Sequence, residues 1–197
     1  RRFLRSFSCV FVFEKGRLMA SIFGHALVAV SIGSTFSIPF KSYKFWLICI
    51  ACSVIPDLDV IGFNFGISYN SFWGHRGFSH SIIFAVILSL FLGILFYSSL
   101  LKTELKKFFL ISFCFFLCTI SHSLLDAMTT GGKGVALLSP FDNTRYFFPW
   151  RVIKVSPIGI SRFFSEWGIR VLLSELKWIG IPSLVYIIMI KLIKKLN

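Results

Sequence analysis

Five apolar stretches divide this 197-residue chain and set the main limit on how it can fold. They cover approximately residues 21–38, 44–60, 81–101, 108–125 and 178–193. A helix needs roughly 17 to 25 residues to cross about 30 Å of hydrocarbon, and these stretches approach or reach that length. Backbone groups in lipid must be satisfied within a helix or a closed barrel. The pattern therefore predicts an all-α, polytopic transmembrane helical bundle of about four to five spans.

Composition and charge agree with a membrane environment. Hydrophobic residues make up 56% of the chain and the mean hydropathy is +0.81, more than a water-soluble domain needs. The 21 Lys and Arg residues exceed the 8 Asp and Glu residues, but they lie between apolar runs instead of along one polar face. Membrane lipids are therefore the expected partners, and nucleic acid is not expected. The sequence leaves the oligomeric state open.

The five cysteines do not suggest a disulfide framework. Cys49, Cys52, Cys114 and Cys118 all lie inside apolar stretches, where a thiol behaves as a small hydrophobic group. The Cys49-x-x-Cys52 pair could bind zinc or undergo redox cycling, but no second pair follows at the usual metal-ligand spacing. Packing inside the helices is the favoured interpretation.

Residues 19–197 are expected to form a single membrane-embedded domain, preceded by a basic extension over residues 1–18. Glu14 to Arg17 occupy the place where a signal peptide would have small residues for cleavage, so we do not expect a cleaved signal; Met19 is a natural alternative start. Between Ala127 and Lys177 the chain is rich in Gly, Pro, Arg and aromatic residues. That mixture predicts an interfacial loop with short amphipathic helices.

All four histidines and three aspartates are expected on one side of the membrane, because alternating crossings place the ends of these stretches together. An ionisable group near hydrocarbon is costly unless it is paired, binds a metal or faces a cavity. The same side carries 13 of the 21 Lys and Arg residues, so the positive-inside rule predicts that it faces the cytoplasm. The seven residues are His25, Asp57, Asp59, His75, His80, His122 and Asp126.

Two short motifs place possible metal ligands together. His122 and Asp126 are four residues apart and share one helical face, although a histidine simply hydrogen-bonded to a carboxylate would look the same. Asp57 and Asp59 follow Pro56, so both carboxylates can turn toward one point at a helix end. Helix termination with a turn is the alternative.

The segment from Trp73 to Ser81 is the most unusual stretch of the chain. His75 and Arg76 are expected in a glycine-flanked loop, and His80 in the first turn of a helix capped by Ser79 or Ser81. Arg76 is then available to hold an anionic group such as phosphate. His25 by itself would be interpreted as a packing residue, but it begins an apolar stretch at the same depth as the others.

Together these motifs resemble the YdjM-like family of bacterial inner-membrane, metal-dependent hydrolases. The resemblance extends from about Met19 to Leu196, and its most specific part is the histidine-rich segment. It rests on Gly24-His25, Pro56 to Asp59, His75 to Ser81, Ser121 to Asp126, Ser139 to Phe141 and Arg145 to Pro149. It implies a multi-pass inner (plasma) membrane protein with a divalent metal ion, a hydrolytic activity whose substrate is not established, and a polar site made of the seven residues above.

If the protein is an enzyme, Asp57, Asp59 and Asp126 are candidate ligands or general bases. Arg76, with Arg145 as a second candidate, would bind the developing negative charge. Mixed His and Asp ligands suit zinc, manganese or iron better than calcium. The position of the site at the membrane interface suggests an amphiphilic or phosphoester substrate.

Other interpretations remain open. A membrane transporter or metal-ion permease also uses intramembrane His and Asp, but its pathway residues should recur through the membrane. A lipid phosphatase of the acid phosphatase-like membrane type is disfavoured, because its Lys-x6-Arg-Pro element is absent from the sequence. Glu166 and Glu175 are expected to pair with Arg162, Arg170 or Lys177 on a solvated helix face, with a place in the metal site as the alternative.

Overall fold

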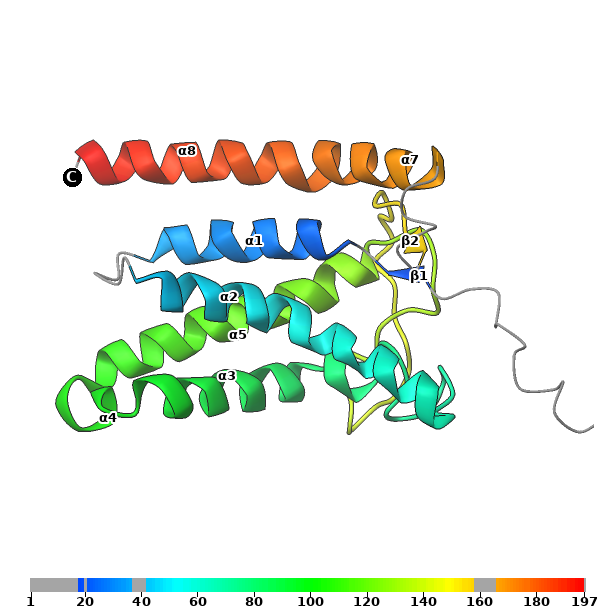
Figure 1. The fold of residues 1–197 in the computed structure, drawn as a ribbon, viewed down its shortest axis with the longest axis horizontal. Helices are drawn as coiled ribbons and strands as arrows, with labels where there is room; N and C mark the ends of the chain where they lie inside the picture. The colour runs from blue at the N-terminus through cyan, green and yellow to red at the C-terminus, as the bar shows by residue number, and fades with distance from the viewer. Residues whose placement is uncertain (1–17, 20, 37–41, 158–165, 197) are drawn as a thin grey trace, which may run out of the picture.

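The protein is a bundle of helices that lie side by side along one long axis (Figure 1). The computed structural model describes residues 18–19, 21–36, 42–157 and 166–196. The irregular segments and a small strand pair gather at one end of the bundle, and the C-terminus lies at the other end (Figure 1). The predicted basic extension, residues 1–18, lies outside the described residues except for Leu18.

The elements follow the apolar stretches of the sequence. They are β1 (Leu18–Met19), α1 (Ile22–Thr35), α2 (Tyr43–Val54), η1 (Ile55–Phe65), η2 (Phe78–His80), α3 (Ile82–Tyr97), α4 (Leu100–Thr103), α5 (Leu105–Ala127), β2 (Ser156–Pro157), α7 (Glu166–Glu175), the π-helical turn η3 (Leu176–Gly180) and α8 (Ile181–Leu196). β1 and β2 pair antiparallel. Serines begin three helices: the side chains of Ser21, Ser42 and Ser81 accept hydrogen bonds from the first turns of α1, α2 and α3.

Each of the five predicted apolar stretches is helical over most of its described residues, so the predicted all-α bundle is confirmed. Among the described residues, three helices are long and apolar enough to cross a membrane: Tyr43–Phe65, Leu105–Ala127 and Glu166–Leu196. α1 and α3 are apolar but shorter, with 14 and 16 residues. One expectation is corrected, because α7 is not a separate interfacial helix. It continues through η3 into α8 as one helix of 31 residues.

The core of the bundle lies where α1, α2, α3 and α5 meet. Ala29, Phe45, Ile111 and Phe115 are almost completely buried there, together with the cysteine side chains of α2 and α5. Large apolar side chains such as Phe91 instead face outward. A surface of this kind is unfavourable in water but suits a hydrocarbon environment.

We predict that Gly93 is required for the close contact between α3 and α5. A Cβ atom at this position would lie 2.5 Å from Ser112 Oγ and 3.3 Å from the Phe108 ring. Gly93→Leu should therefore force the helices apart and destabilise the protein by about 1–3 kcal/mol. Thermal unfolding in detergent measures this, with Leu95→Val on the outward face of α3 as the control. Equal unfolding temperatures for Gly93→Leu and the wild type would contradict it.

Candidate metal centre

The seven predicted residues meet at the end of the bundle that carries β1 and β2. α1 contributes His25, η1 contributes Asp57 and Asp59, and α5 contributes His122 and Asp126. His75 comes from the loop after η1, and His80 ends η2. All seven side chains are buried, with exposed fractions between 0 and 7%. Residues that are up to 101 positions apart in the sequence therefore lie together in the interior of the fold.

Four of these residues form the centre of the site. Asp57, His80, His122 and Asp126 each offer one ligand atom, and these four atoms lie within 4.8 Å of one another. His122 Nε2 is 3.1 Å from His80 Nε2 and 3.3 Å from Asp57 Oδ1. His80 Nε2 is 3.4 Å from Asp126 Oδ2. We call this group the four-residue centre.

The hydrogen bonds of the two histidines direct their Nε2 atoms toward the centre. His122 Nδ1 lies 2.7 Å from the Ser53 carbonyl, and because a carbonyl only accepts, Nδ1 must carry the proton. His80 Nδ1 is hydrogen-bonded to Ser79 Oγ at 3.0 Å and lies 3.2 Å from Asp59 Oδ2. Because the Ser79 hydroxyl donates its own proton to Asp59, His80 Nδ1 is favoured as the donor, which gives the same tautomer. Metal-binding histidines commonly donate their second N–H to a carbonyl or carboxylate in this way. When both Nδ1 atoms carry protons, the two Nε2 atoms can face each other only with a proton or a metal ion between them.

The carboxylates also favour a bound cation. Asp57 is buried, and neither of its oxygens accepts a hydrogen bond of good geometry from the described residues. A buried carboxylate in that condition is costly unless a positive charge compensates it. Asp126 has a positively charged partner, because Arg76 Nε lies 2.9 Å from its Oδ2 atom. Imidazole nitrogen together with carboxylate oxygen is a donor set that fits zinc, manganese or iron.

Asp59 orients the neighbouring loop. It accepts hydrogen bonds from Ser79 Oγ (2.5 Å) and from the Arg76 backbone N–H (3.1 Å), and its Oδ1 lies 2.7 Å from His75 Nδ1. Asp59, His75 and His80 also form a second group of possible ligands within 4.8 Å. The His75 Nε2 atom remains without a hydrogen-bond partner among the described residues. His80 thus joins both groups, one through each ring nitrogen.

The loop that carries His75 and Arg76 depends on tight backbone packing. A Cβ atom at Gly74 would lie 2.3 Å from the Ser68 and Tyr69 carbonyl oxygens, and Arg76 has a positive φ of 63°. This confirms the predicted glycine-flanked loop. Arg145 braces it by donating to the His75 and Tyr69 carbonyls, both at 2.7 Å.

Both predicted arginines form hydrogen bonds or ion pairs with groups of the protein itself. Arg76 is completely buried, pairs with Asp126, and donates to Thr129 Oγ1 and the Gly131 carbonyl at 3.1 Å each. Arg145 uses its guanidinium on backbone carbonyls of the histidine loop. These contacts make Arg76 the counter-charge of Asp126. Binding of a substrate anion by either arginine stays a prediction.

Two local expectations are corrected. His80 does not lie in the first turn of the following helix: it ends η2, and Ser81 caps α3 by accepting from Phe84 N–H at 3.0 Å. Glu175 does not pair with Arg170 or Lys177, because its carboxylate accepts hydrogen bonds from Ser21 on α1. The predicted partner Arg162 lies outside the described residues. Sequence spacing along one helix could not reveal a partner 154 residues away.

A third possible ligand group lies deeper in the bundle. The thiols of Cys49, Cys114 and Cys118 are buried and lie within 4.8 Å of one another. The sequence holds no second Cys-x-x-Cys pair to match Cys49 and Cys52, but Cys114 and Cys118, with three residues between them, are also at a spacing that metal ligands use. The fold instead places Cys49 of α2 against two cysteines one helical turn apart on α5.

The His80 imidazole is held in an environment that favours its charged form. Burial lowers its pKa, but the carboxylates of Asp59, Asp126 and Asp57 outweigh this and hold the pKa well above the ordinary value. The metal-free protein is therefore expected to carry a proton on His80 at pH 7. That proton supplies the positive charge that the facing nitrogens require.

We predict that zinc binding at pH 7 releases a proton from His80. A ligand nitrogen must be deprotonated, and the raised pKa means that protonation competes more strongly as the pH falls, so the apparent zinc affinity should decrease with decreasing pH. Calorimetric titrations in buffers of different ionisation enthalpy count the released protons. His80→Ala should lose this release. Zinc binding to the wild type without proton release would contradict the prediction.

A helical membrane protein with a buried histidine–carboxylate centre at one end of its bundle is the class that the fold and the site define. The chain belongs to the YdjM family, since the family described as YdjM inner membrane protein matches residues 19–196. Inner membrane protein YbcI of Escherichia coli (strain K12) is 37% identical over 174 residues, which cover 84% of this chain and 94% of the relative. No solved structure matches the chain. The predicted family resemblance is confirmed, and with it the membrane location.

Proposed function

We propose that this protein is a membrane-bound, metal-dependent hydrolase whose ion is held by Asp57, His80, His122 and Asp126. The observation that carries the proposal is the convergence of these four ligand atoms, all from buried residues, within 4.8 Å of one another. Each histidine already uses its Nδ1 atom elsewhere, so only Nε2 is directed at the centre. The two Nε2 atoms lie 3.1 Å apart, so one ion can contact both of them.

A divalent ion in this position would lower the pKa of a bound water to about 7 and so provide a nucleophile at neutral pH. The chain supplies the surrounding groups. Asp57 has oxygens without hydrogen bonds from described residues and is the carboxylate best placed to accept a proton. His25 stacks on His122 with ring centroids 3.9 Å apart, and its Nε2 lies 3.8 Å from Asp126 Oδ1. It can join the ligands or transfer a proton at their edge.

A cavity of about 370 Å³ beside the centre supports an amphiphilic substrate. Asp59 and Ser79 form its polar wall, and Asp59 in turn contacts the imidazoles of His75 and His80. The remaining lining is mostly apolar, and the side chains of Leu58 and Trp73 are 55% and 62% exposed. A substrate with an apolar chain and a hydrolysable ester or phosphoester group fits these walls. The excess of basic residues on this side supports a location on the cytoplasmic face of the inner membrane.

The distribution of polar groups favours the hydrolase over a metal-ion permease. A transport pathway should carry His or Asp side chains along the membrane normal. Here the histidines and the aspartates around them gather at one end, while the buried core cluster further along the bundle consists of apolar, aromatic and thiol side chains.

Metal analysis of the purified protein tests the proposed centre. Wild type should contain a stoichiometric divalent ion, and His122→Ala and His80→Ala should each lose it, because each removes a ligand nitrogen. Asp142→Ala is the matched control, since Asp142 pairs with Tyr146 and Thr144 away from the centre. Unchanged folding of all variants is checked by circular dichroism. A correctly folded wild type that binds no metal would end the hydrolase proposal.

We expect the hydrolytic step to depend on the charge of Asp57. Metal-loaded protein in lipid vesicles is supplied with ester and phosphoester amphiphiles, and release of the polar product is measured. Asp57→Asn keeps the size of the side chain but removes the proton acceptor, so turnover should fall by about 10²–10⁴-fold. Equal turnover by wild type and Asp57→Asn would contradict the assigned role.

A further inference from the structure

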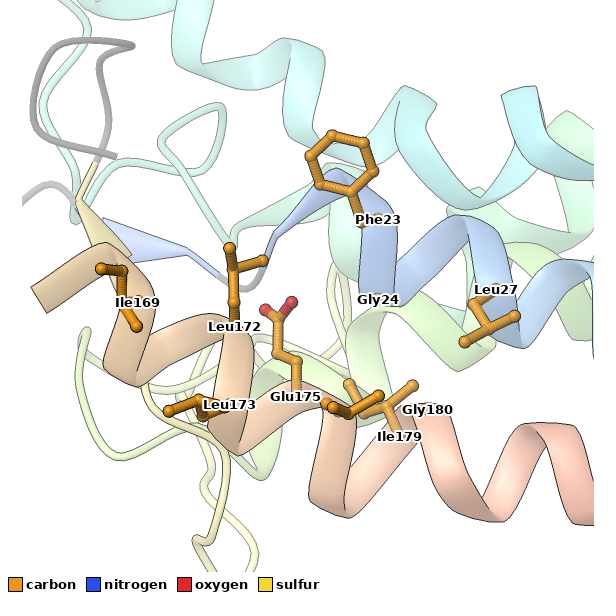
Figure 2. A pocket seen from close by; sticks show the side chains of 10 residues that line it. Phe23, Gly24, Leu27, Ile169, Leu172, Leu173, Glu175, Ile179 and Gly180 are labelled. Carbon is orange, nitrogen blue, oxygen red and sulfur yellow. The ribbon is translucent and has the colours of Figure 1, made fainter. Parts of the chain in front are cut away.

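Glu175 is a buried carboxylate at the end of α7, outside the four-residue centre. Its side chain accepts hydrogen bonds from both donors of Ser21, the backbone N–H at 2.6 Å and the hydroxyl group. The residue is only 5% exposed. Figure 2 shows its carboxylate reaching from the C-terminal helix toward α1 near Gly24, among the side chains of Leu172, Leu173 and Ile179.

Ser21 connects this carboxylate to the metal centre. It is the N-cap of α1, and its hydroxyl oxygen accepts from the Gly24 N–H at 3.4 Å. Its carbonyl oxygen accepts from the His25 N–H at 3.3 Å. The hydrogen bonds therefore run from Glu175 through Ser21 to the backbone of His25.

Close packing reinforces the same connection. A Cβ atom at Gly24 would lie 3.1 Å from Ile179 Cδ1 and 3.4 Å from the Glu175 carboxylate, so α1 and the C-terminal helix pack closely there. Glu175 is followed directly by the π-helical turn Leu176–Gly180. Such turns occur mostly as single insertions in α-helices, frequently at functional sites.

An apolar side chain would be the simpler solution if this contact served packing alone. The cavity beside Glu175 has a volume of about 470 Å³, and apart from Glu175 itself it is lined by Leu, Ile and Phe side chains and by Gly24 and Gly180. Burying a carboxylate among them is costly, and replacing such a group by a hydrophobic residue is often neutral or stabilising. The hydrogen bonds to Ser21 instead indicate that the carboxylate fixes the position of Ser21.

We propose that Glu175 is a positioning residue for the metal centre. By holding Ser21, it keeps the first turn of α1 in place and thereby keeps the His25 imidazole stacked on His122 and beside Asp126. Both nitrogens of His25 lack hydrogen-bond partners among the described residues. The side chain therefore depends on its backbone for its position. This inference rests on the proposed function, since it concerns the same centre.

The test uses the full chain in lipid nanodiscs and four variants. Glu175→Leu removes both acceptor oxygens, Glu175→Gln keeps one, and Ser21→Ala removes the hydroxyl but keeps the backbone N–H. Glu166→Gln is the matched control, because Glu166 is an exposed carboxylate on the same helix. Hydrogen–deuterium exchange of residues 21–27 is measured in the metal-free protein, and zinc affinity is measured by competition with a chromogenic chelator.

Glu175→Leu should accelerate exchange in residues 21–27 and weaken zinc binding about 10-fold, at the lower end of the effect of groups that orient metal ligands. Glu175→Gln and Ser21→Ala should show intermediate effects, and Glu166→Gln should match the wild type. If Glu175→Leu does not fold, these two variants decide the question.

Unchanged exchange in residues 21–27 would overturn the proposal. Accelerated exchange with unchanged zinc affinity would overturn it as well, because Glu175 would then only fasten the helices together. A wild type that binds no zinc would refute the proposed function instead. The exchange measured in the metal-free variants would still show whether Glu175 holds the first turn of α1.

Discussion

The close approach of two imidazole nitrogens is the interaction on which the rest of the site depends. His80 and His122 point their Nε2 atoms at each other across 3.1 Å, with Asp57 and Asp126 beside them. Because Ser53 and Asp59 hold the opposite ring nitrogens, neither ring can turn away without losing a buried hydrogen bond. The arrangement is stable only with a positive charge between the nitrogens, and a metal ion or a proton provides it.

Much of the surrounding structure keeps these four side chains in place. Arg76 balances the charge of Asp126, and Arg145 braces the loop that presents His75. Glu175 connects the C-terminal helix to the start of α1. Each of these contacts joins segments that are distant in the sequence, so the centre is a property of the assembled bundle. A small change in how η1, η2 and α5 pack would separate the four ligands.

The helices and the composition of the site were predictable because both leave a local signal. Apolar stretches of the right length predict helices in lipid. Ionisable residues such as His122 and Asp126 are energetically unfavourable near hydrocarbon, so their position at the ends of those stretches predicts a common site. The partners were not predictable. Ser53 contributes only a backbone carbonyl, and Ser21 is one serine among many, so neither carries a signal that distinguishes it in the sequence.

The sequence by itself determined that this chain is a helical membrane protein and that seven ionisable residues gather at one side. The physical reason is the high cost of charge and of unpaired backbone groups in hydrocarbon, which restricts where such residues can lie. Only the tertiary structure decided which four ligand atoms converge, that Arg76 serves Asp126, and that Glu175 bonds to Ser21. Those outcomes depend on helix rotation and close packing over distances of a few ångströms, which the order of residues along the chain does not display.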